Sequence, residues 1–168
     1  MNAETILEAL DETRERLLRA LELLPDDALL EPGAVGEWSI AAVLDHMTAW
    51  ESELVTALMR IDQGKKPARL LEIDADVDGY NARRFAENRG RSLDRIFDDL
   101  QRVRLQLEQW LEEFSARDLT DPGRYRWAQN KPLWQIIKAN SFGHEAEHLA
   151  AVETFAAKWQ AQSTIDSG

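Results

Sequence analysis

Apolar residues recur at helical spacing along most of this chain, and this periodicity restricts the fold more than any other feature of the sequence. In the first such segment, about residues 5–24, one face is apolar and the other carries acids and arginines. The same pattern predicts helices over about residues 40–61, 93–114 and 132–160, and a shorter one over about 74–88. No segment shows the alternation of a convincing strand. The sequence therefore predicts an all-α protein.

The predicted architecture is a four-helix bundle that forms a single domain over residues 1–168. A chain of 168 residues with 44% hydrophobic residues is long enough to bury one core. We expect an up-down arrangement, with a long middle connection that starts near Gly64 and carries the short extra helix. Residues from about 162 to 168 are expected to form a disordered tail.

The sequence also contains an internal similarity. Residues Leu24 to Gly33 align without gaps on residues Phe114 to Gly123, and in each copy a helix precedes and a histidine-bearing helix follows. One interpretation is that Pro-Gly turns after helices look alike. The other is that two similar helical hairpins are related by a pseudo-twofold axis, which would bring the two histidine-bearing helices into comparable positions.

Composition excludes several kinds of function. The formal net charge is −11, from 31 acidic and 20 basic residues, which argues against a nucleic acid partner. The absence of cysteine excludes disulfides, thiolate metal sites and cysteine nucleophiles, and fits a reducing compartment. The N-terminus lacks the features of a signal peptide, and no apolar run approaches the roughly 20 residues that span a bilayer. We therefore expect a cytoplasmic protein with no membrane partner.

The three histidines of the chain are the strongest candidates for a functional site. His144 and His148 lie four residues apart on the apolar line of the last helix, and His46 flanks the apolar line of an earlier one. Three imidazoles without a thiolate favour a divalent ion, Zn²⁺ or Ni²⁺ first and Fe²⁺ as a further possibility. Three protein ligands leave one position for water or substrate, as in catalytic sites. The alternative is that the histidines are hydrogen-bonded core residues.

Two polar residues fall where the pattern predicts apolar ones. Glu51 lies on the apolar line of its helix, and such conflicts tend to mark functional or strained positions. Asn140 occupies an inward-facing turn of the last helix. We predict that Glu51 and Asn140 act in catalysis, and that Asn81 contacts the substrate or supports the ligands. Glu145 and Glu147 are expected to face solvent.

Several motifs in order along nearly the whole chain carry a resemblance to a known family. They are Val35-Gly36-Glu37-Trp38-Ser39, Leu44-Asp45-His46-Met47-Thr48-Ala49-Trp50-Glu51, residues 81–88, Asp121-Pro122-Gly123-Arg124-Tyr125-Arg126-Trp127, Lys131-Pro132-Leu133-Trp134, and Asn140-Ser141-Phe142-Gly143-His144-Glu145-Ala146-Glu147-His148. With these motifs the sequence resembles the DinB-like superfamily of four-helix-bundle proteins. Within it, the sequence looks most like the DfsB branch, which includes colibactin self-protection proteins.

This resemblance implies a metal site and a class of reactions. The metal triad of the superfamily maps onto His46, His144 and His148, and its enzymes are divalent-metal-dependent thiol transferases, isomerases or hydrolases. The colibactin-protection members open a cyclopropane ring by hydrolysis but lack the full triad, so this activity is not carried over. Many members are dimers, which implies a homodimer here.

The resulting hypothesis is a divalent-metal-dependent enzyme, either a hydrolase or a thiol transferase, acting on a small electrophilic metabolite. A transferase would use a thiol cofactor, and Arg124 and Arg126 are candidates to bind the carboxylates of such a thiol. A second hypothesis is a non-catalytic protein that binds a small molecule and protects the cell. A third is a dimeric scaffold with structural histidines. The sequence identifies neither the substrate nor the metal.

Overall fold

Four long helical segments form a bundle in the computed structural model, which describes residues 1–167; residue 168, at the end of the expected tail, lies outside the described residues. The long segments are α1 (Ala3–Glu22), α3 (Ile40–Asp62), α6 (Leu93–Leu111), and α8 (Leu133–Asn140) followed by α9 (Phe142–Asp166). The connections carry α2 (Asp26–Leu29), α4 (Ala68–Asp74), α5 (Val77–Asn88), α7 (Ala116–Thr120) and the 3-10 turn Arg126–Ala128. No strand occurs in the described part of the chain, so the all-α prediction is confirmed.

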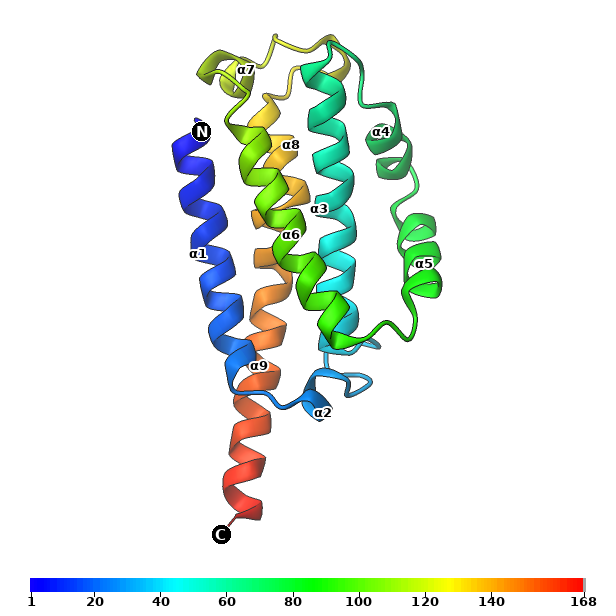
Figure 1. Cartoon of the computed structure of the whole chain (residues 1–168), viewed down its shortest axis with the longest axis vertical. Coiled ribbons are helices and arrows are strands. Elements are labelled where there is room, and N and C mark those ends of the chain that lie inside the picture. The colour runs from blue at the N-terminus through cyan, green and yellow to red at the C-terminus, as the bar shows by residue number, and fades with distance from the viewer. Residues whose placement is uncertain (168) are drawn as a thin grey trace.

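The long middle connection determines the direction of the helices. It leads from the end of α3 back to the level where α3 begins, so that α6 runs parallel to α3 and packs against it (Figure 1). Helices α1 and α9 likewise run side by side in one direction, opposite to that of α3 and α6 (Figure 1). The connection carries two helices, α4 and α5, where the sequence predicted one, and both pack against α3.

Side-chain caps explain where several helices begin. Ser39 accepts a hydrogen bond from the backbone N–H of Ala42 at 3.1 Å and thereby fixes the start of the helix that carries His46. Ser92 caps α6 in the same way. At α7, Ser115 and Asp118 form a reciprocal capping box.

The last long helix is not continuous, which corrects the single helix predicted for residues 132–160. The backbone of Ser141 leaves the helical region, with φ −140° and ψ −107°, and its hydroxyl donates to the carbonyl of Ile137 at 2.5 Å. A Cβ atom on Gly143 would lie 2.7 Å from the carbonyl oxygen of Lys138, so only glycine fits where α9 begins against the end of α8. Helix α9 then continues to Asp166, into the segment that was expected to be a disordered tail.

The two halves of the bundle repeat one another. The short helices α2 and α7 follow α1 and α6 at corresponding places, and each buries a leucine, Leu29 or Leu119. The spacing that aligns Leu24 with Phe114 also aligns the buried positions of α1 with those of α6: Ile6 with Ile96, Leu10 with Leu100, Leu17 with Leu107, and Leu21 with Leu111. This agreement favours the interpretation of two similar hairpins related by a pseudo-twofold axis.

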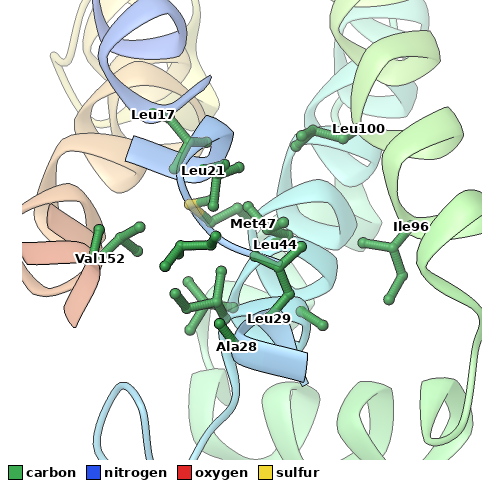
Figure 2. Packing of buried hydrophobic residues seen from close by; sticks show 14 of the residues in the cluster. Leu17, Leu21, Ala28, Leu29, Leu44, Met47, Ile96, Leu100 and Val152 are labelled. Atoms are coloured by element: carbon green, nitrogen blue, oxygen red, sulfur yellow. The ribbon is translucent and has the colours of Figure 1, made fainter. Parts of the chain in front are cut away.

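The bundle core consists of two apolar clusters separated by a polar layer. One cluster, at the end of the bundle where α2 lies, includes Leu21, Leu44 and Val152, and Figure 2 shows its side chains converging between the helices. The other, towards α7, includes Leu58 and Leu133. Between them lie buried charged residues and the histidines. A third, smaller cluster holds α4 and α5 against α3. Within residues 1–167 no helix is both long and apolar enough to cross a membrane.

Candidate metal centre

Three imidazole rings meet between α3 and α9. His46 comes from α3, and His144 and His148 come from successive turns of α9, where four-residue spacing places them on one face. The Nε2 atom of His144 lies 2.9 Å from Nε2 of His46 and 3.2 Å from Nε2 of His148. The structure thus brings together the three residues that the sequence singled out, and one nitrogen from each lies within 4.8 Å of the others.

These distances fit a shared metal ion. Two nitrogen atoms bound about 2.0–2.1 Å from one tetrahedral ion lie roughly 3.3 Å apart. Two of the three separations, 2.9 and 3.2 Å, are close to this value, so these two pairs of rings need little movement to ligate one ion. The donor set, three imidazole nitrogens and no sulfur, suits a borderline divalent cation.

The surroundings keep the three rings neutral, the form in which imidazole ligates a metal. Burial lowers the pKa of His46 to about 3, with a further contribution from the nearby His144 and His148. Burial and His148 lower the pKa of His144 to about 4, although Glu145 opposes the shift. The pKa of His148 is also lowered by burial. Near pH 7 all three rings are therefore neutral, and each has one unprotonated ring nitrogen that can ligate a metal ion.

A cavity of about 450 Å³ opens beside two of the histidines. His46 and His144 line it together with Trp50, Asn81 and Asn140. Asn140 is 6% exposed and donates a hydrogen bond from Nδ2 to the carbonyl of Ile136 at 2.9 Å, which holds its side chain in place. The Oδ1 atom of Asn81 accepts a hydrogen bond from Nε1 of Trp50 at 2.8 Å. Both predicted asparagines therefore lie in the wall of the cavity that reaches the histidines.

Glu51 has a different environment. Its carboxylate receives two hydrogen bonds from Arg104, at 2.8 and 3.1 Å, and it lines neither of the cavities that contain His46. This bidentate ion pair explains how a carboxylate is accommodated on the apolar line of α3. A catalytic role for Glu51 stays a prediction, and the geometry favours an indirect one through the position of α3.

The prediction for Glu145 was wrong, because its side chain is buried rather than exposed to solvent. It is 2% exposed and receives two hydrogen bonds from Arg14, both at 3.1 Å, and one from Arg104 at 2.8 Å. Burying an unpaired carboxylate would be costly, but here both oxygens accept hydrogen bonds from guanidinium groups. The prediction for Glu147 agrees with its position: it is exposed, at the rim of the cavity beside His144.

Three buried charged residues, Glu51, Arg104 and Glu145, form a quartet with the half-buried Arg14. Arg104 pairs with Glu51 and also donates to the carbonyl of Leu10 at 2.9 Å. Arg14 pairs with Glu145 and also donates to the carbonyl of Leu100 at 3.3 Å. Burial acts to lower the pKa of Arg104, but the neighbouring carboxylates of Glu51 and Glu145 outweigh this effect and raise the pKa above its usual value. Arg104 therefore stays charged and joins α3 to α9, the two helices that carry the histidines.

The arginines that were candidates to bind a thiol cofactor lie elsewhere. Arg124 and Arg126 line a separate cavity that contains none of the histidines. Arg124 pairs with Asp118 at 2.7 Å and lies over the ring of Tyr125. The structure does not bring these arginines into the wall of either cavity beside His46.

The fold and the site together define a class: helical-bundle proteins with a three-histidine site compatible with a divalent metal. The chain belongs to the DinB superfamily, whose family model matches residues 9–152. Its fold is similar to that of an uncharacterised protein from Escherichia coli UTI89 known from a crystal structure, with a TM-score of 0.75 over 95% of each chain and 13% sequence identity. No curated protein matches the sequence.

Proposed function

We propose that this protein is a divalent-metal-dependent enzyme that acts on a small molecule, with His46, His144 and His148 as the metal ligands. The observation that supports this most directly is the convergence of three neutral imidazoles with ligand atoms within 4.8 Å of one another, two of the separations being close to those that a tetrahedral ion requires. A divalent ion bound there supplies Lewis acidity, polarising a substrate atom and acidifying a coordinated water or thiol.

The adjoining cavity supports a catalytic rather than a purely structural role. Three protein ligands leave a coordination position open, and His46 and His144 both face a cavity of about 450 Å³, a size suited to a small molecule. Zn²⁺ and Ni²⁺ suit this donor set best, and Fe²⁺ is a third candidate. Asn140 and Asn81, in the cavity wall, are proposed to hydrogen-bond the substrate and orient it towards the histidines.

Two reactions fit this arrangement, hydrolysis and thiol transfer to an electrophilic metabolite. Both need a nucleophile whose proton is easily lost, and neither needs a further covalent catalyst from the protein. Transfer would need a thiol cofactor in addition to the metabolite. We propose membership of the DfsB branch, a homodimeric assembly and a cytoplasmic location as further parts of this assignment, on the basis of the motifs that resemble that branch.

A non-catalytic protective protein is the alternative function. A second cavity contacts His46, and a protein that sequesters a toxic small molecule needs such a binding site without any chemistry. Turnover of a candidate electrophile by the metal-loaded protein would distinguish the two functions.

Metal analysis of the protein, purified without a histidine tag, tests the proposal. We expect one equivalent of Zn²⁺ or Ni²⁺ per chain after loading and dialysis, and its loss in His148→Ala with the helical circular dichroism retained. Lys158→Ala is the matched control, because Lys158 is an exposed residue further along the same helix. If the unmodified protein cannot be loaded with stoichiometric metal, the proposed function is wrong.

A further inference from the structure

A second cavity of about 200 Å³ shares His46 with the candidate metal centre. Of the three histidines only His46 lines it, and most of the remaining wall comes from the start of α3, from α5 and from the turn that precedes α6. Asn81 lies in the walls of both cavities. A ligand in the second cavity would therefore adjoin the metal centre from another direction than a ligand in the first.

One wall of this second cavity is aromatic. The rings of Trp38 and Phe85 are stacked, with their planes 10° apart and their centroids 5.8 Å apart. Phe85 is 44% exposed and packs in none of the three core clusters. Trp38 also packs edge-on against His46, with centroids 4.8 Å apart. The wall offers a flat, apolar surface that leads to a predicted metal ligand.

The charges around this cavity are opposite to those of the protein as a whole. Three arginines line it: Arg84, Arg89 and Arg91. Among the described residues of its wall, Asp45 is the only acidic one. Arg91 pairs with Asp45 at 2.6 Å, which leaves two guanidinium groups without an acid from the wall itself. In a chain of net charge −11, this local excess of positive charge favours an anionic ligand.

Arg84 has an unused hydrogen-bond donor. Its Nε atom is buried and has no hydrogen-bond partner. Within residues 1–167 it is the only buried side-chain nitrogen or oxygen that lacks one. Its Nη1 atom donates to Glu87 at 3.2 Å, but that carboxylate is 60% exposed and easily displaced. A buried donor without an acceptor is unfavourable. The side chain of Arg84 as a whole is 37% exposed, and its guanidinium fork matches carboxylate geometry.

We propose that this cavity binds a small organic carboxylate with a flat apolar body. The body lies against Trp38 and Phe85, the carboxylate pairs with Arg84 and Arg89, and the other end of the molecule points towards His46. That this carboxylate is also the substrate of the metal centre is a further step, which rests on the proposed function. The binding itself depends only on the aromatic wall and the arginines, and not on the metal.

The test uses 2-naphthoate and its neutral counterpart 2-naphthamide as probes of the full-length protein, first stripped of metal with a chelator. Isothermal titration calorimetry measures both dissociation constants. We expect 2-naphthoate to bind at least about tenfold more tightly, since a hydrogen bond to a charged group contributes that much. Arg84→Gln should remove this preference, and Phe85→Leu should weaken both probes alike.

Arg83→Gln is the matched control. Arg83 is the neighbouring residue of α5, is 60% exposed, pairs with Asp76 at 3.6 Å and does not line the cavity. It should leave the preference for 2-naphthoate unchanged. Equal affinity for the two probes, no binding of either, or equal effects of Arg84→Gln and Arg83→Gln would overturn the proposal. A protein that selects the carboxylate but retains no metal would leave this site standing and remove the proposed function.

Discussion

Replacing Arg104 with methionine should reveal how much the charged quartet contributes to stability. The side chain of Arg104 is 6% exposed and provides both guanidinium hydrogen bonds of Glu51 and one of the three that Glu145 accepts. Methionine has a similar length and no charge, so it keeps most of the packing while it leaves Glu51 buried without a close partner.

The expected loss follows from the contacts that remain. Removing one partner of a buried ion pair costs about 3–5 kcal/mol. Arg14 still binds Glu145 at 3.1 Å and lies 3.9 Å from Glu51, so the negative charges keep part of their compensation. We therefore expect a decrease of about 3 kcal/mol in the free energy of unfolding, from a total of about 5–15 kcal/mol. Urea denaturation followed by circular dichroism, with a chelator present, measures this difference.

Arg102→Met is the control for this experiment. Arg102 lies on the same helix, is 66% exposed and pairs with Asp99, so its replacement should change the free energy of unfolding by less than about 0.5 kcal/mol. Adding Glu51→Gln to Arg104→Met should recover part of the loss, because it removes the unpaired charge. If Arg104→Met lowered the free energy of unfolding no more than Arg102→Met, Arg104 would not compensate the buried charges of Glu51 and Glu145.

Three further perturbations test the site and its supports. Gly143→Ala should weaken metal binding about tenfold and lower stability, because a Cβ atom 2.7 Å from the carbonyl of Lys138 has to displace α9 one residue before His144; metal titration and denaturation measure both effects. In the chelated protein, acidification from pH 6 to 5 should lower the free energy of unfolding by up to about 1.4 kcal/mol each for His46 and His144. The unfolded chain takes up protons below about pH 6.5, while His46 (pKa about 3) and His144 (pKa about 4) stay neutral in the folded protein. Denaturation of His46→Gln should show a correspondingly shallower pH dependence. Tyr80→Phe should cost about 1 kcal/mol in the same assay, because the buried hydroxyl donates to Glu53 at 3.2 Å.

Most helices could be predicted from the sequence, because their signals are local. Apolar periodicity and the caps at Ser39 and Ser92 depend on residues a few positions apart. The break at Ser141 is different, since a serine and a glycine inside an apolar helical pattern signal a break only weakly. What decides the break is the contact of Gly143 with the carbonyl of Lys138, which sequence periodicity does not describe.

The burial of Glu145 shows where local reasoning fails. It lies between the two histidines in the sequence and off the apolar line of the helix, so the pattern suggested a solvated face. Its hydrogen-bond partners Arg14 and Arg104 come from α1 and α6, far away in the sequence. One signal was available: each arginine interrupts a line of leucines at the same place, four residues after Leu10 or Leu100. That correspondence becomes visible only once the two helices are aligned over their full length.

The pseudo-twofold relation also shows how the candidate metal centre departs from the symmetry of the bundle. In this relation Arg14 of α1 corresponds to Arg104 of α6. Arg104 binds Glu51 and Arg14 binds Glu145, so the two glutamates are equivalent as well. Aligning these two glutamates pairs the three histidines, position by position, with other residue types: His46 with Asn140, His144 with Trp50, and His148 with Leu54.

The charged quartet is thus symmetric, whereas the imidazoles are not. Asn140 and Trp50, which take the places of histidines in the other half, line the cavity that reaches His46 and His144. One half-site therefore presents metal-ligating nitrogens, and the equivalent half-site presents a carboxamide and an indole ring. In a duplicated bundle held together by a shared polar layer, the two halves of that layer can differ in this way without a change in the helices around it. This difference places the proposed metal next to the proposed substrate contacts. Because Asn140 lies in the half-site without imidazoles, its replacement should affect turnover more than metal retention.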